Sequence, residues 1–216
     1  MRQIFKDNQS GSKLSFTVRL FFELCIVFFG VYLAFLLNEF RVNEELERHQ
    51  IQLLSGLNKE IEYFLYGDSG GAKMREPGML KQFEGWQKSV ASGEKKVPLY
   101  FKMLGNALPT RSMWQVIIYS DGLNLLDVPT TFKLSKYYNS FDIMLNKYQK
   151  LIDFAEAEII PYVNKPDLFY QAKGQLNPKF RAYVERYADF LVLFKLMIKD
   201  SEAIKIRLQA EIKRLE

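Results

Sequence analysis

Residues 20–37 of the chain read Leu-Phe-Phe-Glu-Leu-Cys-Ile-Val-Phe-Phe-Gly-Val-Tyr-Leu-Ala-Phe-Leu-Leu, an 18-residue run that only Glu23 interrupts. A helix needs about 20 predominantly apolar residues to cross the hydrocarbon core of a bilayer. Phe16 and Val18 extend the run toward the N-terminus, and no second run of this length follows. The run therefore predicts a transmembrane helix over residues 15–38, in preference to a buried core helix.

The residues around the run predict its orientation. Four basic residues precede it, and two follow it within a dozen residues beside four glutamates: Arg2, Lys6, Lys13 and Arg19 before, Arg41 and Arg48 after. Basic residues favour the cytoplasmic side of a membrane. Residues 1–14 are therefore expected to form a polar cytoplasmic leader. Because the 19 residues before the run are long for a signal peptide and no small-x-small cleavage site follows, we expect an uncleaved anchor.

Small and polar residues share one face of the predicted span. At about 100° per residue, five of them lie within about 60° of one direction, in line with Arg19 and Arg41: Glu23, Val27, Gly30, Ala34 and Asn38. Small residues four apart let a second helix approach closely, and polar residues in a span prefer a partner to lipid. This packing stripe predicts self-association or docking on another membrane protein.

Glu23 has other interpretations besides packing. Arg19 lies one turn away, so the two residues can form an ion pair that snorkels to the cytoplasmic interface. In that case the small residues have no special role, since such residues are common in spans. A membrane effector or channel subunit that uses Glu23 is a further alternative, although intramembrane acids of that kind usually lie deeper or have ionisable companions.

A helical pattern continues beyond the span. Between Asn38 and Gly67 the only helix breaker is Gly56. Apolar residues in this segment keep a period of about 3.6 residues: Leu46, Leu53, Leu54, Leu57, Ile61, Phe64 and Leu65. The pattern predicts a stalk helix over residues 39–66, about 42 Å long at a rise of about 1.5 Å per residue.

Residues 67–216 are predicted to form a helical domain that packs with the stalk. A Gly-rich turn is expected over residues 67–77, and a helix over residues 79–91. Pro109 and Gly122 are placed for the start and the end of a further helix.

The last two helices are the longest of this domain. From Leu134 to Ile159 the apolar residues alternate gaps of four and three, which is typical of a long packed helix, and Pro178 opens the final helix. No alternation of apolar and polar residues is long enough to indicate a sheet. The fold class is therefore predicted to be all-α, a transmembrane helix and stalk followed by an antiparallel helical bundle.

Few residues could support catalysis. The single cysteine, Cys25, excludes a disulfide within the chain, and the single histidine, His49, excludes most zinc sites. Gly67-Asp-Ser-Gly-Gly71 resembles the nucleophile loop of serine proteases, but that chemistry needs a histidine base and two β-barrels. His49 lies about twenty residues away on a predicted helix. We therefore expect no catalytic residue, no cofactor and no metal site, and we do not expect an enzyme.

The other charged and aromatic residues favour structural roles. Di-metal helical bundles usually need two Glu-x-x-His motifs, so the pairs Glu156/Glu158 and Glu185/Asp189 are expected on solvated faces. From Glu39 onward 26 basic and 23 acidic residues are mixed, so no nucleic-acid partner is expected. Large aromatic residues at helical spacing are usually core residues. That location is expected, ahead of a binding groove, for Trp86, Trp114, Tyr137 and Tyr138.

One resemblance covers most of the chain. It is carried by Glu23-x-x-x-Val27-x-x-Gly30-Val31-x-Leu33-Ala34-x-x-x-Asn38-Glu39, by Leu53-Leu54-x-x-Leu57-x-x-Glu60-Ile61, and by Trp114, Gly122-Leu-Asn-Leu-Leu126, Leu134 and Tyr137-Tyr138. These residues resemble a group of functionally uncharacterised bacterial single-span membrane proteins with an anchor, a stalk and a helical domain. The resemblance implies this architecture and a bacterial location, and no activity.

Taken together, these features predict a single-pass protein of the bacterial inner (plasma) membrane with a periplasmic or extracytoplasmic C-terminal domain. Its expected partners are the lipid bilayer and either a second copy, as a homo-oligomer, or another membrane protein. We expect it to act as a helical interaction or scaffold protein.

Overall fold

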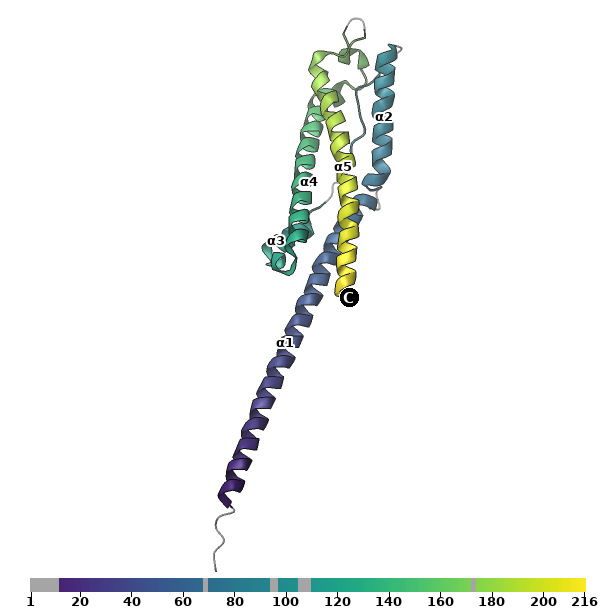
Figure 1. The fold of residues 1–216 in the computed structure, drawn as a ribbon. Helices are drawn as coiled ribbons and strands as arrows, with labels where there is room; N and C mark the ends of the chain where they lie inside the picture. Colours follow the sequence, from purple (N-terminus) through teal and green to yellow (C-terminus); the bar gives the residue numbers. More distant parts are fainter. Residues whose placement is uncertain (1–11, 68–69, 94–96, 105–109, 172–173) are drawn as a thin grey trace, which may run out of the picture. The chain divides into compact units, whose positions relative to one another are not determined.

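The computed structural model describes residues 12–67, 70–93, 97–104, 110–171 and 174–216. Within these residues the regular elements are helices, together with one isolated antiparallel bridge between Tyr170 and Leu176 (Figure 1). The α-helices are α1 (Ser12–Tyr66), α2 (Ala72–Ser92), α3 (Ser112–Tyr119), α4 (Val128–Phe154) and α5 (Pro178–Leu215). The predicted all-α fold class is confirmed.

Short helical turns connect these helices. A 3-10 turn, η1 (Gly122–Leu125), lies between α3 and α4. A π-helical turn, η2 (Ala155–Ile159), and a 3-10 turn, η3 (Ile160–Tyr162), follow α4 directly. The helical path that was predicted up to Ile159 therefore continues to Tyr162, because Pro161 is compatible with the first turn of a 3-10 segment. A last 3-10 turn, η4 (Pro166–Phe169), precedes α5.

The chain divides into two compact units, residues 1–49 and residues 50–216. The boundary lies inside helix α1, within the segment that was predicted as a stalk. In the first unit, the described large apolar side chains from Phe16 to Leu46 are between 41% and 79% exposed. Helix α1 carries, from Val18 onward, a segment long and apolar enough to cross a membrane, with a mean hydropathy of 2.5.

The described residues of the second unit form a hydrophobic core, to which the last part of α1 contributes. All but Leu46 of the residues that gave this segment its helical period are buried here: Leu53, Leu54, Leu57, Ile61, Phe64 and Leu65. The ring of Phe64 meets Phe141 of α4 and Phe194 of α5 edge-on, at centroid distances of 5.6 and 6.2 Å. Residues 50–66 are therefore a core element of the second unit.

Helices α4 and α5 run antiparallel, side by side (Figure 1). Progressively later residues of α4 contact progressively earlier residues of α5: Tyr137 meets Ser201, Tyr148 meets Phe190, and Phe154 meets Tyr183. Pro178 occupies the first position of α5, as predicted, and Asn177 caps the helix by accepting a hydrogen bond from the Lys179 N–H. The two long helices of the predicted bundle are therefore present, and the second of them begins at the predicted residue.

Helix α2 begins earlier than predicted. Residues 67–77 were expected to form a turn, yet α2 starts at Ala72 and contains Pro77. A proline inside a helix costs about 3 kcal/mol. Packing offsets this cost, because Ala72 and Met79 are only 3% and 2% exposed and lie on either side of the proline. The expectation of a turn up to Pro77 was therefore wrong.

The end of α3 also differs from the prediction. Gly122 was expected to end this helix, but α3 ends at Tyr119, and the backbone reverses at Asp121, which has a φ of 54°. Gly122 instead allows a close approach, since a Cβ there would lie 3.1 Å from Leu53 Cδ1 and 3.2 Å from Ile117 Cα. Pro109, the predicted start, lies outside the described residues, and α3 begins at Ser112.

Candidate functional site

The predicted packing stripe lies in the first unit, on consecutive turns of α1. All five of its residues are exposed, Val27 by 66%. A Cβ added at Gly30 would meet no atom within 4 Å. The small side chains at Gly30 and Ala34 therefore leave an open track along the helix, onto which a second helix could pack. That a partner occupies this track stays a prediction.

Arg19 and Glu23 form the ion pair that their spacing suggested. Arg19 Nε donates a hydrogen bond to Glu23 Oε1 at 3.2 Å, and the two side chains are 80% and 60% exposed. The pair spans one turn of α1, the geometry in which opposite charges support a helix. Pairing also neutralises the single acid of the apolar run. That the pair lies at a membrane interface stays a prediction.

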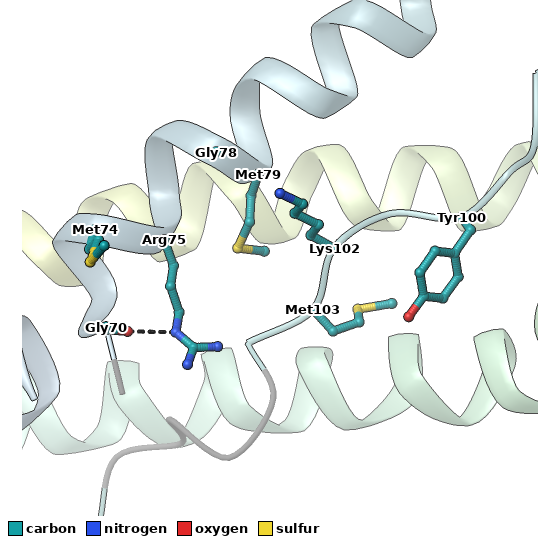
Figure 2. A pocket seen from close by; sticks show the side chains of 8 residues that line it. All are labelled: Gly70, Met74, Arg75, Gly78, Met79, Tyr100, Lys102 and Met103. Atoms are coloured by element: carbon teal, nitrogen blue, oxygen red, sulfur yellow. Dashed lines mark hydrogen bonds between the residues drawn. The ribbon is translucent and has the colours of Figure 1, made fainter. Parts of the chain in front are cut away.

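An open hollow of about 710 Å³ lies in the second unit, beside the start of α2. Its lining comes from α2, from the residue Gly70 before it, and from the extended segment 100–103 (Figure 2): Gly70, Met74, Arg75, Gly78, Met79, Tyr100, Lys102 and Met103. Three methionine side chains supply polarizable apolar surface. The eight described residues that line it include no carboxylate, histidine or cysteine, and Arg75, Tyr100 and Lys102 supply its polar side chains.

Arg75 holds the two walls of this hollow together. Its Nε donates a hydrogen bond to the carbonyl of Gly70 at 2.5 Å, and its Nη1 donates to the carbonyl of Leu104. The guanidinium thus ties Gly70, two residues before α2, to Leu104, which follows segment 100–103. The contacts indicate a structural role for Arg75, which the sequence analysis did not single out. No local pattern could have shown it, since Leu104 is 29 positions away.

The residues weighed for catalysis do not assemble into a site in the described part of the chain. Asp68 and Ser69 of the protease-like sequence lie outside the described residues, and His49 is exposed on α1 in the first unit. The described residues contain no cluster of three or more His, Cys, Asp or Glu side chains that could hold a metal ion. Of the acidic pairs, Glu185 and Asp189 are exposed, and Glu158 pairs with Lys179 of α5.

The four aromatic residues that could have lined a groove are core residues. Trp86, Trp114, Tyr137 and Tyr138 are between 3% and 7% exposed. The rings of Trp114 and Tyr138 stack at 5.1 Å with an angle of 4° between their planes. Burial raises the pKa of the Tyr137 and Tyr138 hydroxyls far above the ordinary value of 10. The prediction that these residues belong to the core is confirmed.

Glu60 caps helix α3 from a different helix. Its Oε2 accepts a hydrogen bond from the Met113 N–H at 2.9 Å, and its Oε1 accepts one from the Tyr138 hydroxyl at 2.8 Å. Arg111, at the N-cap position of α3, provides no side-chain cap. The first N–H groups of a helix lack partners within the helix, so Glu60 supplies the missing acceptor. No local sequence pattern indicates this contact, because Met113 and Tyr138 are 53 and 78 positions away from Glu60.

Helix α5 presents an exposed apolar face that the sequence analysis did not single out. Five exposed apolar residues lie on this face of α5: Val192, Leu196, Ala203, Ile206 and Ala210. The signal was available in the sequence, because these residues are also spaced three, four or seven apart. It was passed over because a stronger apolar pattern on the opposite face of the same helix supplies the core.

No protein-family model matches the chain, and neither a curated protein nor a solved structure matches it. The likeness to bacterial single-span membrane proteins thus rests on the residues quoted for it.

Proposed function

We propose that the chain is a single-pass protein of the bacterial inner membrane whose helical domain binds a partner or a second copy, and that it is not an enzyme. The observation that carries this proposal is the apolar run of α1. All of residues 20–37 are exposed except the half-buried Cys25. An apolar surface of this size is unfavourable in water, and the hydrocarbon core of a bilayer would surround it with apolar groups.

Two further observations support interaction as the mode of action. Gly30 and Ala34 leave an accessible track for a second helix within the apolar run. The described residues of the second unit include a large aromatic core and an open hollow whose lining has no carboxylate, histidine or cysteine. A rigid helical unit on an anchor is suited to holding a partner close to the membrane. The resemblance to bacterial anchored proteins agrees with this role.

Membrane insertion can be tested by paired charge substitutions. Two arginines near the centre of a span cost roughly 5 to 7 kcal/mol on an insertion scale, so Phe29→Arg with Leu33→Arg should release the protein from membranes into the alkaline-extracted fraction. The matched control is Val42→Arg with Leu46→Arg, which has the same four-residue spacing outside the run. If both pairs of substitutions released the protein equally, or if neither pair released it, the proposed anchor would be contradicted.

Sidedness can be tested with reporter domains at the two ends. The basic residues before the run favour a cytoplasmic N-terminus, so a reporter that is active only outside the cytoplasm should work at the C-terminus and stay inactive at the N-terminus. A C-terminal reporter that is active only in the cytoplasm would reverse the proposed topology while leaving the anchor intact.

Partner binding through the span can be tested by cross-linking in native membranes. Gly30→Ile should reduce the cross-linked species, because the branched side chain fills the open track. Phe28→Ile is the control, since residue 28 lies two positions away, about 160° round the helix. A strictly monomeric, partner-free protein whose Gly30→Ile variant behaves like wild type would refute the interaction function.

A further inference from the structure

Helix α5 has two apolar faces on opposite sides. One face is buried in the core and includes Phe190, Phe194, Met197, Ser201, Ile204 and Leu208. The other is exposed, with Val192, Leu196 and Ile206 at 61%, 50% and 67% exposure. We define the α5 outer stripe as Val192, Leu196, Lys199, Ala203, Ile206 and Ala210. A surface helix that packs only against its own core is expected to be polar on its outer side, so the outer stripe calls for a separate explanation.

The outer stripe has the spacing of a coiled-coil seam. Its residues follow one another at gaps of four, three, four, three and four. At about 100° per residue they all lie within about 40° of one direction, and they run along about 27 Å of the helix. Apolar residues at alternating gaps of three and four are the a and d positions through which two helices pack. The natural occupant of such a face is therefore another helix.

The charged residues beside the outer stripe identify that helix. With Leu196, Ala203 and Ala210 at a, Lys195 and Glu202 occupy g positions, and Asp200 and Arg207 occupy e positions. In a parallel coiled coil, a g residue of one helix faces the e residue five positions later in the other, and opposite charges there set the partner. Lys195 would face Asp200 of a second copy, and Glu202 would face Arg207. Both pairs are complementary, so α5 matches itself.

The same charges disfavour an antiparallel pair. An antiparallel arrangement centred near Ser201 would set Asp200 against Asp200 and Glu202 against Glu202, which is repulsive. Lys199 at a d position fits the parallel pair as well, since a lone polar residue in the seam fixes the register and lowers the affinity. Ala203 and Ala210 are small, so the two helix backbones can approach closely.

The intramolecular contacts of the flanking residues leave the outer stripe accessible. Glu202 accepts a hydrogen bond from Lys73 of α2 at 2.5 Å, and Arg207 donates to Thr130 Oγ1 of α4 at 2.9 Å. Lys195 and Asp200 come before both of these contacts on α5, and their side chains are exposed. They therefore offer the clearest position for a test, since neither side chain takes part in the ion pairs that join α5 to Lys73 of α2 and to Asp127 at the start of α4.

We propose that the α5 outer stripe is the surface through which two copies of the chain pair, with their α5 helices parallel and in register. The proposal rests on the proposed function, because it names a second copy as the partner. A seam of three heptads with a lysine in it binds weakly in solution. Confinement of both copies to one membrane would raise their effective concentration and make such a contact sufficient.

Disulfide trapping in the full chain tests the register. In a Cys25→Ala background, Ala203→Cys places one thiol at the centre of the seam, where the two copies meet. Mild oxidation of native membranes should convert most of this variant to a covalent dimer. Ala182→Cys is the matched control, the same substitution at an exposed position of α5 before the stripe. Equal and low trapping of both variants would overturn the proposal.

Charge reversal tests the identity of the partner. Lys195→Glu alone turns two attractive pairs of the dimer into repulsive ones, and Asp200→Lys alone does the same. Each single variant should weaken dimerisation about tenfold, and the double variant should restore it. The readout is the monomer–dimer distribution of the full chain, by single-molecule photobleaching, in phosphatidylethanolamine–phosphatidylglycerol vesicles at several protein-to-lipid ratios. A double variant no better than the singles would refute self-pairing at α5.

The outcomes separate this proposal from the function on which it rests. If alkaline extraction releases the wild-type protein from membranes, the proposed anchor fails. A second outcome is that the protein stays in membranes and an amine-reactive cross-linker captures a complex that neither charge reversal nor Ala203→Cys affects. In that case the proposed interaction function stands, and the proposed pairing through the α5 outer stripe fails. If the Ala203→Cys variant forms a disulfide only with a different protein, the proposal that a second copy occupies the outer stripe is also overturned.

Discussion

The hydroxyl of Tyr137 donates a hydrogen bond to Ser201 Oγ, at 2.8 Å, between two buried residues of α4 and α5. The direction of this bond follows from the serine, whose own hydrogen points to the Met197 carbonyl at 2.7 Å. Tyr137 and Ser201 are 5% and 0% exposed. A buried hydroxyl without a partner is costly, so this bond favours one register of the two helices.

Removing Ser201 should therefore destabilise the fold more than removing both hydroxyls. Ser201→Ala leaves the Tyr137 hydroxyl buried without its acceptor and should lower the free energy of unfolding by about 1 to 3 kcal/mol. Adding Tyr137→Phe should recover part of the loss, because no unpaired hydroxyl remains. Denaturant unfolding of the full chain in detergent, followed by circular dichroism, measures this. Additive losses in the double variant would contradict the assigned bond.

Glu60 should contribute more to the stability of the fold than Glu62 does. Glu60→Gln keeps the shape of the side chain but cannot accept from both the Met113 N–H and the Tyr138 hydroxyl, so a loss of about 1.5 to 3 kcal/mol is expected. Glu62→Gln is the control, since Glu62 only pairs with Lys205 at 2.8 Å near the surface and should cost less than about 1 kcal/mol. Equal unfolding midpoints for the two variants would show that Glu60 does not cap α3.

The free energy of unfolding of the second unit should depend on pH through Asp127. It caps α4 by accepting from the Thr130 N–H at 2.8 Å. Hydrogen bonds from Thr130, helped by the charge of Arg207, hold the pKa of Asp127 below its ordinary value of 3.8. Because the carboxylate is favoured in the folded state, its contribution is complete above about pH 4 and is lost as the pH falls through the lowered pKa.

Substitution of Asp127 tests this dependence. Asp127→Ala should lower stability by about 1 kcal/mol at neutral pH, and the difference from wild type should shrink as the pH falls below about 4. Asp127→Asn keeps a capping oxygen and should lose less at neutral pH. Thermal unfolding between pH 3 and pH 7 is the measurement. A difference between wild type and Asp127→Ala that grows toward low pH would have the opposite sign to this prediction.

Glu23 distinguishes the proposed function from its alternative. Glutamine keeps the size and the hydrogen-bonding groups that Glu23 presents on the packing stripe and to Arg19. Glu23→Gln should therefore leave membrane retention and cross-linking unchanged if the chain acts by binding. A membrane effector or channel subunit that uses Glu23 would instead lose conductance in planar bilayers, or toxicity in cells, with the same substitution. Arg19→Gln serves as the companion variant, since it removes the pair and keeps the acid.

Sequence patterns predicted the long helices because their apolar spacing is regular. The alternation from Leu134 to Ile159 and the proline at position 178 located α4 and α5 without any knowledge of contacts. The patterns failed where packing outweighs local preference. Ala72 starts a helix in spite of Pro77, and Gly122 serves a close approach to Leu53 instead of a helix end.

The candidate interaction surfaces were predictable to different degrees. The packing stripe of the span follows from the order of Glu23, Gly30 and Ala34 alone. The capping role of Glu60 could not be predicted, because it depends on Met113 and Tyr138 reaching the same side chain. The spacing of the α5 outer stripe is present in the sequence, but burial was needed to show which of the two apolar faces of α5 supplies the core.

The place of residues 50–66 in the core has a consequence for biogenesis. Phe64 packs against Phe194, a residue near the other end of the chain. Synthesis proceeds from the N-terminus at roughly 5 to 20 residues per second, so this segment leaves the ribosome several seconds before its partner exists. During that interval its leucines and phenylalanine are uncovered, and a chaperone that shields nascent apolar segments has a defined target there. Chains truncated before α5 should accordingly be cleared by proteases.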